Sequence, residues 1–450
     1  MSRSSGSVLS VPSVVNPLRI AYLAAGAGGM YCGSCLHDNT LAAALIEAGE
    51  DVTLIPTYTP LRTDEPNVAR GRVFFGGVNA YLLQDAVWFR RAPKWLRRLL
   101  DSSALLRLAT RNAGSVDPKK LGPMTVSTLR GAAGNQASQI KELTDWLSAE
   151  LKPDVVHLSN SMLLGMAAPI ATACGCPVVC NLSGEDLFLE QLDEPHHDEA
   201  RALLREHADG VAAFTALNGY YADHMAEYLG VERDRIHVVP HGLKLDAETT
   251  PREAEAEGVP IIGYLARVCG DKGLHVLVEA GRLLAERRPD LEFEIHSAGY
   301  LGAADCGYLI DLHRQVDQSH LAGRFHYRGE LSRTAKFDFL RSLTLFATPT
   351  IYAEAKGLPA LEAMAVGVPA VLPDHGSFPE MIADTGGGIL HEPADAESLA
   401  SRLERLLADA ETRQRLSTAA AAAIRDRYSA AQMAEATLAV YRAVAEVRPT

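Results

Sequence analysis

The sequence predicts an α/β protein made of two doubly wound, Rossmann-like domains that face a cleft. Short apolar runs alternate with helical stretches along the chain, and apolar strands separated by helices are typical of parallel sheets covered on both faces. An acidic segment at residues 246–260 lacks apolar periodicity and divides the alternation into two series. In sheets of this kind, ligands bind beyond the carboxyl ends of the strands.

The first series is expected to begin with a buried strand at residues 18–26 and a helix at 39–50. Further strands are expected at 51–58, 154–160, 177–184 and 210–218. The second series starts at residue 261, and its expected strands read IIGYLARV, LEFEIHSAGY, RFHYRGE, LTLFATPT and PAVLP. The resulting division is a disordered leader (1–17), a first domain (18–245), a linker (246–260), a second domain (261–428) and a closing helix (429–450).

Composition excludes several classes of protein. The chain of 450 residues has 43 basic and 56 acidic side chains, a formal charge of −13, which argues against general nucleic-acid binding. No apolar run approaches the roughly 20 residues that span a bilayer, and the N-terminus has no signal-peptide core. Seven cysteines, an odd number, without a secretion signal favour a reducing cytoplasm over a disulfide framework.

The stretch AAGAGGMYCGSCLHDN, residues 24–39, places a glycine run where the first strand should lead into the first helix. Backbone N–H groups at such a turn can receive an anion. A dinucleotide site is disfavoured, because Tyr31 stands where the third glycine of G-x-G-x-x-G belongs, and the second strand ends without a carboxylate for a ribose. A plain flexible turn is the alternative.

Cys32 and Cys35 in the same stretch form a Cys-x-x-Cys pair. A zinc site shared with Cys174 and Cys176 is disfavoured, because the two pairs are expected at opposite edges of the sheet. A strand separates those edges by roughly 17–20 Å, whereas zinc–sulfur bonds are about 2.3 Å long. We expect the cysteines to line the loop as small side chains, and regulatory redox chemistry remains the alternative.

A charged constellation follows the strands of the second series. Arg267 and Lys272 lie in one loop, and TIYAEAKGLPALEAMAVGVPAV, residues 350–371, contains Glu354 and Glu362. Pro359 suits the first turn of a helix that Gly367 and Pro369 would stop. The free N–H groups of that helix N-terminus suit a diphosphate, and Glu362 suits the hydroxyl groups of a ribose. Helix stabilisation and surface ion pairs are the alternatives for these charges.

These residues carry a family resemblance. The pattern R-x4-KG, followed by E-x7-E within GLP-LEAMA-G-P-V, resembles the retaining glycosyltransferases of family 4, which have the GT-B fold. PDVVHL, VVPHGL and HGSFPEMI…TGGGIL fit the same pattern, so the resemblance covers about residues 18–445. It implies a nucleotide-diphosphate sugar bound by the second domain, an unidentified acceptor mainly on the first domain, and a closing helix that crosses back to the first domain.

The resemblance also implies residue roles. Arg267, Lys272 and the helix N-terminus at Gly357, Leu358 and Pro359 would stabilise the leaving diphosphate without a metal or other cofactor. Glu354 would hold donor sugar hydroxyls, and Glu362 the ribose. Gly28 and Gly29 would close over the donor. The implied reaction is hexosyl transfer with retention of configuration, by front-face attack in which the departing phosphate oxygen takes the acceptor proton.

The sequence departs from the family in two places. Many relatives have a histidine that touches the donor sugar where Ser183 stands here, followed by Glu185 and Asp186. These three residues are candidate sugar or acceptor contacts, and capping of the next helix is the alternative for the two carboxylates. His241 stands where asparagine is common, and a structural role is favoured for it.

The segment WFRRAPKWLRRLLDSSALLRLATR, residues 88–111, is strongly basic and amphipathic at helical spacing. A peripheral contact with the inner face of a membrane is one interpretation, and an ordinary surface helix is the other.

Two other functions compete with glycosyl transfer. One is a GT-B sugar-nucleotide epimerase, and the other is a non-catalytic nucleotide-sugar-binding or redox-regulated protein.

Overall fold

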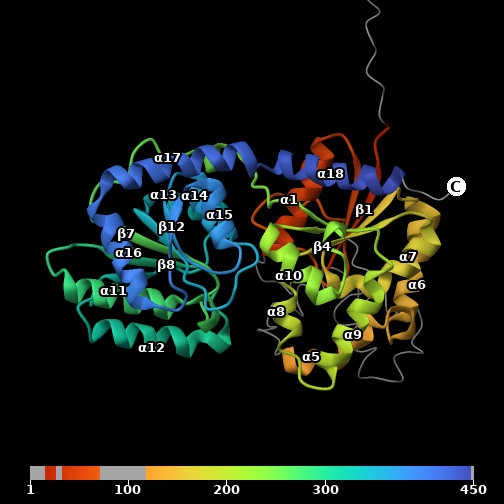
Figure 1. Cartoon of the computed structure of the whole chain (residues 1–450), viewed down its shortest axis with the longest axis horizontal. Helices are drawn as coiled ribbons and strands as arrows, with labels where there is room; N and C mark the ends of the chain where they lie inside the picture. The colour runs from red at the N-terminus through yellow and green to blue at the C-terminus, as the bar shows by residue number, and fades with distance from the viewer. Residues whose placement is uncertain (1–15, 27–32, 71–117, 447–450) are drawn as a thin grey trace, which may run out of the picture.

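The computed structural model describes residues 16–26, 33–70 and 118–446. Figure 1 shows two lobes side by side, each with a sheet at its centre and helices around it. The first sheet is parallel and runs β2-β1-β3-β4-β5-β6. Its strands are β1 (Arg19–Ala24), β2 (Asp51–Pro56), β3 (Val155–Leu158), β4 (Val178–Leu182), β5 (Ala213–Ala216) and β6 (Ile236–Val238).

The second sheet is also parallel and runs β12-β11-β10-β7-β8-β9. Its strands are β7 (Ile261–Leu265), β8 (Glu294–Ala298), β9 (Phe325–Tyr327), β10 (Leu345–Ala347), β11 (Ala370–Pro373) and β12 (Gly388–His391). Two parallel sheets with helices on both faces confirm the predicted α/β class.

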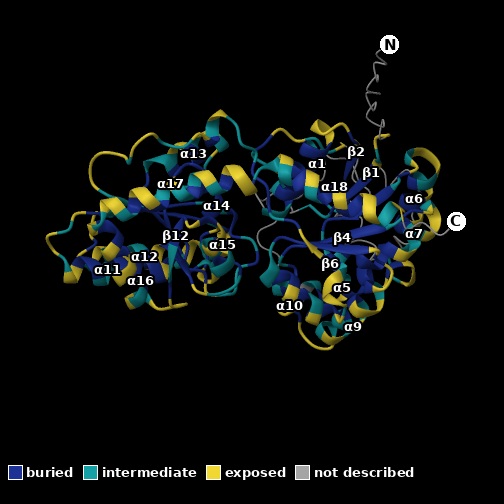
Figure 2. Ribbon diagram, turned by 45° about the horizontal axis from the view of Figure 1, so that its top comes forward, coloured by how far each residue is buried: buried dark blue, intermediate teal, exposed yellow. Residues whose placement is uncertain are grey.

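Alternate residues of each strand enter different cores, as the two-residue period of a strand requires. In the first domain, Ile20 and Tyr22 pack under α1 and α18, whereas Ala21 and Leu23 pack on the opposite side. The helices there are α1 (Gly33–Glu47), α5 (Pro118–Leu129), α6 (Ala137–Trp146), α7 (Ala167–Cys174), α8 (Asp186–Leu189), α9 (His196–Ala208), α10 (Gly219–Leu229) and α18 (Ala430–Glu446). Figure 2 shows the sheets buried and the outer helix faces exposed.

The second domain repeats this layering. α11, α12 and α16 contribute to the core on one face of its sheet, and α13, α14, α15 and α17 to the core on the other. These helices are α11 (Leu274–Arg287), α12 (Cys306–Asp317), α13 (Arg333–Ser342), α14 (Leu358–Ala365), α15 (Phe378–Thr385), α16 (Ala396–Ala408) and α17 (Ala410–Arg427).

Two parts of the chain connect the domains, and they run side by side. The backbone N–H of Leu243 donates to the Tyr428 carbonyl at 2.7 Å, and the N–H of Ala430 donates to the Leu243 carbonyl at 2.8 Å. The chain then enters α18, which lies along the first domain (Figure 1). The Tyr441 hydroxyl of α18 lies 2.7 Å from Nδ1 of His157 in β3.

The structure differs from the expected elements at three places. α1 begins at Gly33, six residues before the expected start, because its first turns are anchored: Asp38 is buried and accepts a hydrogen bond from the Tyr22 hydroxyl at 2.9 Å. The strands β6 and β12 were not expected. Both are short, partly exposed edge strands, so neither produces a continuous apolar run.

Within the described ranges, no helix combines the length and apolarity that a bilayer crossing needs. The basic segment 88–111 lies outside the described residues, as do Gly28, Gly29 and Cys32.

Candidate active site

A cavity of about 1040 Å³ lies between the two domains, at the carboxyl ends of both sheets. In the second sheet, the strand order reverses between β7 and β10, and ligands of doubly wound sheets bind at such a switch point. The loop after β7 supplies Arg267 and Lys272 to the cavity, and the segment after β10 supplies Tyr352 and Lys356. The fold therefore brings the two predicted charged loops to one place.

Lys272 is the centre of a partly buried polar cluster at this switch point. Its Nζ lies 2.5 Å from Oε2 of Glu354 and also contacts the Tyr352 hydroxyl. That hydroxyl donates to the same carboxylate oxygen at 2.9 Å. Burial favours the neutral acid, but the charge and hydrogen bonds of Lys272 and Tyr352 hold the pKa of Glu354 below its usual range. Glu354 is therefore a carboxylate that fixes the position of the Lys272 ammonium.

Glu354 was predicted to hold hydroxyl groups of the donor sugar, but its position in the structure is different. Lys272 and Tyr352 line the cavity, whereas Glu354 lies behind them and is not a lining residue. The backbone N–H of Lys356 also donates to Glu354, at 3.3 Å. These three N–H and O–H donors replace the hydrogen bonds that the Glu354 carboxylate loses when it is removed from water. In this arrangement, Glu354 acts on the cavity indirectly, because it holds the Lys272 ammonium that lines it.

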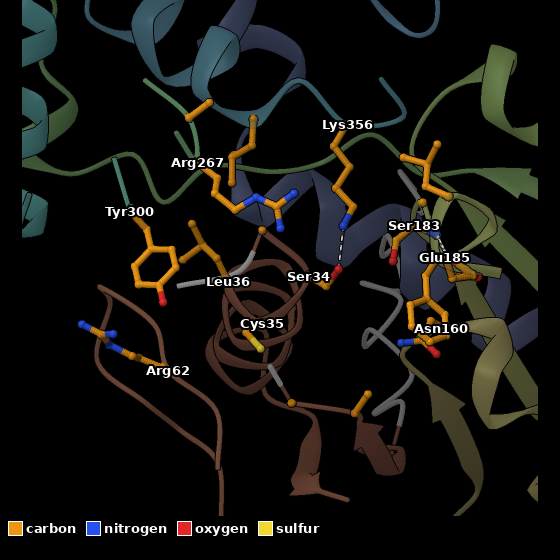
Figure 3. Close-up of a pocket in the computed structure, with 18 of the residues that line it drawn as sticks. Ser34, Cys35, Leu36, Arg62, Asn160, Ser183, Glu185, Arg267, Tyr300 and Lys356 are labelled. Atoms are coloured by element: carbon orange, nitrogen blue, oxygen red, sulfur yellow. Dashed lines mark hydrogen bonds between the residues drawn. The ribbon is translucent and has the colours of Figure 1, made fainter. Parts of the chain in front are cut away.

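Arg267 and Lys356 extend toward α1 from the second domain (Figure 3). The guanidinium of Arg267 lines the cavity, and its Nε donates to Sγ of Cys269 at 3.2 Å. Lys356 crosses between the domains, and its ammonium donates to Oγ of Ser34 in the first turn of α1 at 2.6 Å. Sequence reasoning missed Lys356, although it immediately precedes the predicted helix start at Gly357.

α14 begins where the sequence predicted. Gly357 is its N-cap with φ +64°, and a Cβ atom there would lie 2.5 Å from Cε of Met381. The left-handed backbone conformation therefore favours glycine, and a side chain there would also have to displace the end of Met381. Leu358 and Pro359 line the cavity, and Gly357 does not. The predicted N-terminus thus borders the cavity through its first two helical residues.

Glu362 was predicted to bind the hydroxyl groups of a ribose, but in the structure its carboxylate is ion-paired. Nζ of Lys336 in α13 lies 2.5 Å from Oε1 of Glu362 and 2.6 Å from Oδ2 of Asp64 in the first domain. Burial opposes the charge on Lys336, but the two carboxylates raise the pKa of its ammonium. All three side chains are nearly buried and line the cavity. The predicted ribose carboxylate is thus part of a clamp between the domains.

Of the three candidate contact residues after β4, two line the cavity and one does not. Ser183 and Glu185 line the cavity. The Glu185 carboxylate accepts the backbone N–H groups of Ser161 at 2.9 Å and Ser183 at 2.7 Å, and burial nevertheless raises its pKa. Asp186 is not a lining residue, so it lies away from the cavity in which a sugar or acceptor contact was predicted for it.

Asp186 is directed instead toward α10. It accepts a hydrogen bond from the Tyr221 hydroxyl at 2.6 Å and lies 3.0 Å from Nε2 of His224. Burial favours its neutral form, but these two partners hold the pKa of Asp186 below its usual range. The side chain of Glu185, the N-cap residue of α8, makes no cap hydrogen bond.

His241 pairs with a second histidine beside the connections between the domains. Its Nδ1 lies 2.8 Å from Nδ1 of His37 in α1, and both side chains are buried. Burial lowers the pKa of His241 to about 3 and that of His37 well below its usual range. One neutral ring therefore donates to the other, and neither lines the main cavity, in agreement with a structural role for His241.

Of the two cysteine pairs, the described members Cys35, Cys174 and Cys176 lie at the two expected edges of the first sheet. Cys35, in the first turn of α1, lines the cavity at the carboxyl edge of the first sheet. Cys174 ends α7 and Cys176 precedes β4, so both lie at the opposite edge. This placement agrees with the argument against a zinc site shared by the two pairs.

Comparison with known proteins is consistent with this architecture. Residues 39–242 match the family model "Glycosyl transferase 4-like domain", and residues 246–423 match "Glycosyl transferases group 1". The chain is 31% identical over 378 residues to α-maltose-1-phosphate synthase of Mycolicibacterium smegmatis, covering 78% of this chain and 92% of that protein. It is 29% identical over 285 residues to D-inositol 3-phosphate glycosyltransferase of Paenarthrobacter aurescens, covering 60% and 67%.

Solved structures share the fold. Sucrose-phosphate synthase from Thermosynechococcus elongatus superposes with a TM-score of 0.68 at 15% identity, over 94% of this chain and 98% of that one. Anabaena Alr3699/HepE in complex with UDP-glucose gives 0.65 at 14% identity, over 95% and 100%. The molecule is thus a glycosyltransferase. The chain belongs to family 4 of these enzymes, with the GT-B fold.

Proposed function

We propose that this enzyme transfers a hexosyl group from a nucleotide-diphosphate sugar to a hydroxyl group of an acceptor, with retention of configuration and without a metal. The observation that carries the proposal is the meeting of Arg267, Lys272 and the N-terminus of α14 at the strand-order reversal of the second sheet. Two fixed cations and a helix N-terminus suit a diphosphate. The likeness to HepE, whose structure contains UDP-glucose, supports a donor of this class.

In the proposed reaction, the bond between C1 of the hexose and the diphosphate oxygen breaks. The acceptor oxygen forms its bond to C1 on the same face, and its proton passes to the departing phosphate oxygen. Negative charge develops on the diphosphate, where Arg267 and Lys272 stabilise it electrostatically. Glu354 acts as a positioning residue, because its carboxylate already holds the Lys272 ammonium.

The metal-independent part of the proposal rests on these positive groups. Lys356 adds a further ammonium at the cavity wall, where it is oriented by Ser34. Because the positive groups come from different segments of a buried framework, they need little reorganisation when charge develops.

The test is a donor screen with purified protein. A panel of nucleotide sugars is incubated with candidate acceptors, with and without a chelator, and the release of nucleoside diphosphate is measured. We expect release with at least one donor, unaffected by the chelator, and a glycoside whose anomeric proton coupling matches that of the donor. A product of inverted configuration would refute retention, and release that stops with the chelator would refute metal independence. No release with any donor, together with no binding of any nucleotide, would refute the proposed donor site.

A further inference from the structure

The first-domain side of the cavity has an apolar wall, which no predicted site residue occupies. Leu121, Met124, Thr125 and Thr128 of α5 all line the cavity. Their spacing of three, four and seven residues places them on one face of the helix. Leu121 and Met124 are only partly buried, so their apolar surface is available to a ligand.

Two other segments extend this wall. Met162 and Leu163 come from the 3-10 helix that follows β3, and Leu187 and Phe188 come from α8. Met162, Leu187 and Phe188 are again partly buried. Apolar side chains from three separate segments therefore meet on one side of the cavity.

The described charged groups on this side are held by protein partners. Glu185 accepts two backbone N–H groups. Asp38 accepts the Tyr22 hydroxyl. Arg62, at the edge of the cavity, lies 2.9 Å from Glu330 of the second domain. With these charges held, the described part of this wall offers the apolar side chains together with uncharged polar ones such as Asn160 and Gln191.

We propose that the acceptor is amphipathic: its hydroxyl-bearing head faces the charged second-domain wall, and its apolar body lies on α5, α8 and the segment after β3. This inference rests on the proposed transferase function, because that function places the acceptor opposite the donor cations. Burying an apolar body there removes hydrocarbon from water and tightens binding by about fourfold for each fully buried methylene.

Binding of methyl, butyl and hexyl β-D-glucopyranoside, measured by titration calorimetry, tests the proposal. The three probes share one head, so their differences report the alkyl chain. We expect hexyl glucoside to bind at least tenfold more tightly than methyl glucoside. Met124→Gln and Phe188→Gln should each reduce this preference at least threefold. Ile310→Gln, which alters an exposed apolar side chain on α12, should not change it.

Circular dichroism verifies that each variant is folded, and Leu121→Gln replaces any variant that is not. Equal binding of the three glucosides, or a chain-length preference that persists in every cavity variant, would overturn the proposal. The readout is separate from turnover. Chain-length-dependent binding without any sugar transfer would refute the proposed function alone, and transfer without chain-length dependence would refute this inference alone.

Discussion

The two sides of the cavity hold their polar groups in different ways. On the second-domain side, full charges face one another at short range: Lys272 with Glu354, and Lys336 with Glu362, with Asp64 reaching Lys336 from the first domain. On the first-domain side, the buried Glu185 carboxylate is held by backbone N–H groups, and apolar side chains of α5, α8 and the segment after β3 form one part of the wall. The neutral histidine pair lies in the same domain, away from the cavity. A preorganised set of cations suits a substrate that develops charge, whereas an apolar wall suits one that remains neutral.

The largest effect should come from the clamp between the two sides. Lys336→Met leaves Glu362 and Asp64 facing each other without the ammonium, and breaking a buried ion pair in this way costs about 3–5 kcal/mol. Arg62→Ala breaks the exposed pair with Glu330, for which we expect less than about 1 kcal/mol. Chemical denaturation measures the free energy of unfolding of both variants. Equal, small losses would show that the clamp is no stronger than a surface pair.

Lys272→Ala should lower turnover by about 10²–10³-fold, because it removes a preorganised positive group from the proposed leaving diphosphate. Lys141→Ala removes an exposed lysine paired with Asp145 and should leave turnover unchanged. The rate of nucleoside diphosphate release measures both variants. Full activity in Lys272→Ala would mean that the donor phosphates bind elsewhere.

The histidine pair makes the first-domain side sensitive to acid. The unfolded chain binds a proton near pH 6.5, whereas burial lowers the pKa of folded His241 to about 3. Stability therefore falls as pH drops below 6.5, by about 2 kcal/mol for one such histidine at pH 5. Replacing His241 with asparagine should reduce the stability lost between pH 7.5 and pH 5 by about that amount. Parallel pH profiles of unfolding for the two proteins would contradict this account.

Asp186→Asn should have the smallest effect on catalysis. Its carboxylate faces Tyr221 and His224 and not the cavity, so we expect turnover within about threefold of the wild type, since a change outside the site does not reach the transition state. Steady-state kinetics measures this. A loss comparable to that of Lys272→Ala would place Asp186 in the site after all.

The same contrast explains what the sequence could predict. Arg267, Lys272 and the start of α14 lie in two short stretches, so their residue types and spacing are visible without a structure. The ion pair of Glu362 was less accessible, because its partner Lys336 and the nearby Asp64 are distant from it in the sequence and nothing local marks them as partners. The apolar wall combines side chains from three separated segments that look like ordinary core.

For secondary structure too, elements marked by a local sequence pattern were predicted, and elements without such a pattern were missed. Buried strands such as β1 and β4 were predicted because their apolar runs are continuous. The edge strands β6 and β12 were missed because their residues are partly exposed. The start of α1 was missed because its first turns consist of small and polar residues, and their burial depends on contacts such as that between Asp38 and Tyr22.

The most direct test of the central claim is the equilibrium binding of nucleoside diphosphates, measured by titration calorimetry on wild-type protein, Arg267→Ala, Lys272→Ala and the control Lys141→Ala. If the charged side of the cavity holds the donor diphosphate, at least one nucleotide binds the wild type and the control equally. Binding to each of the other two variants is then at least tenfold weaker. Equal binding by all four proteins would contradict the account.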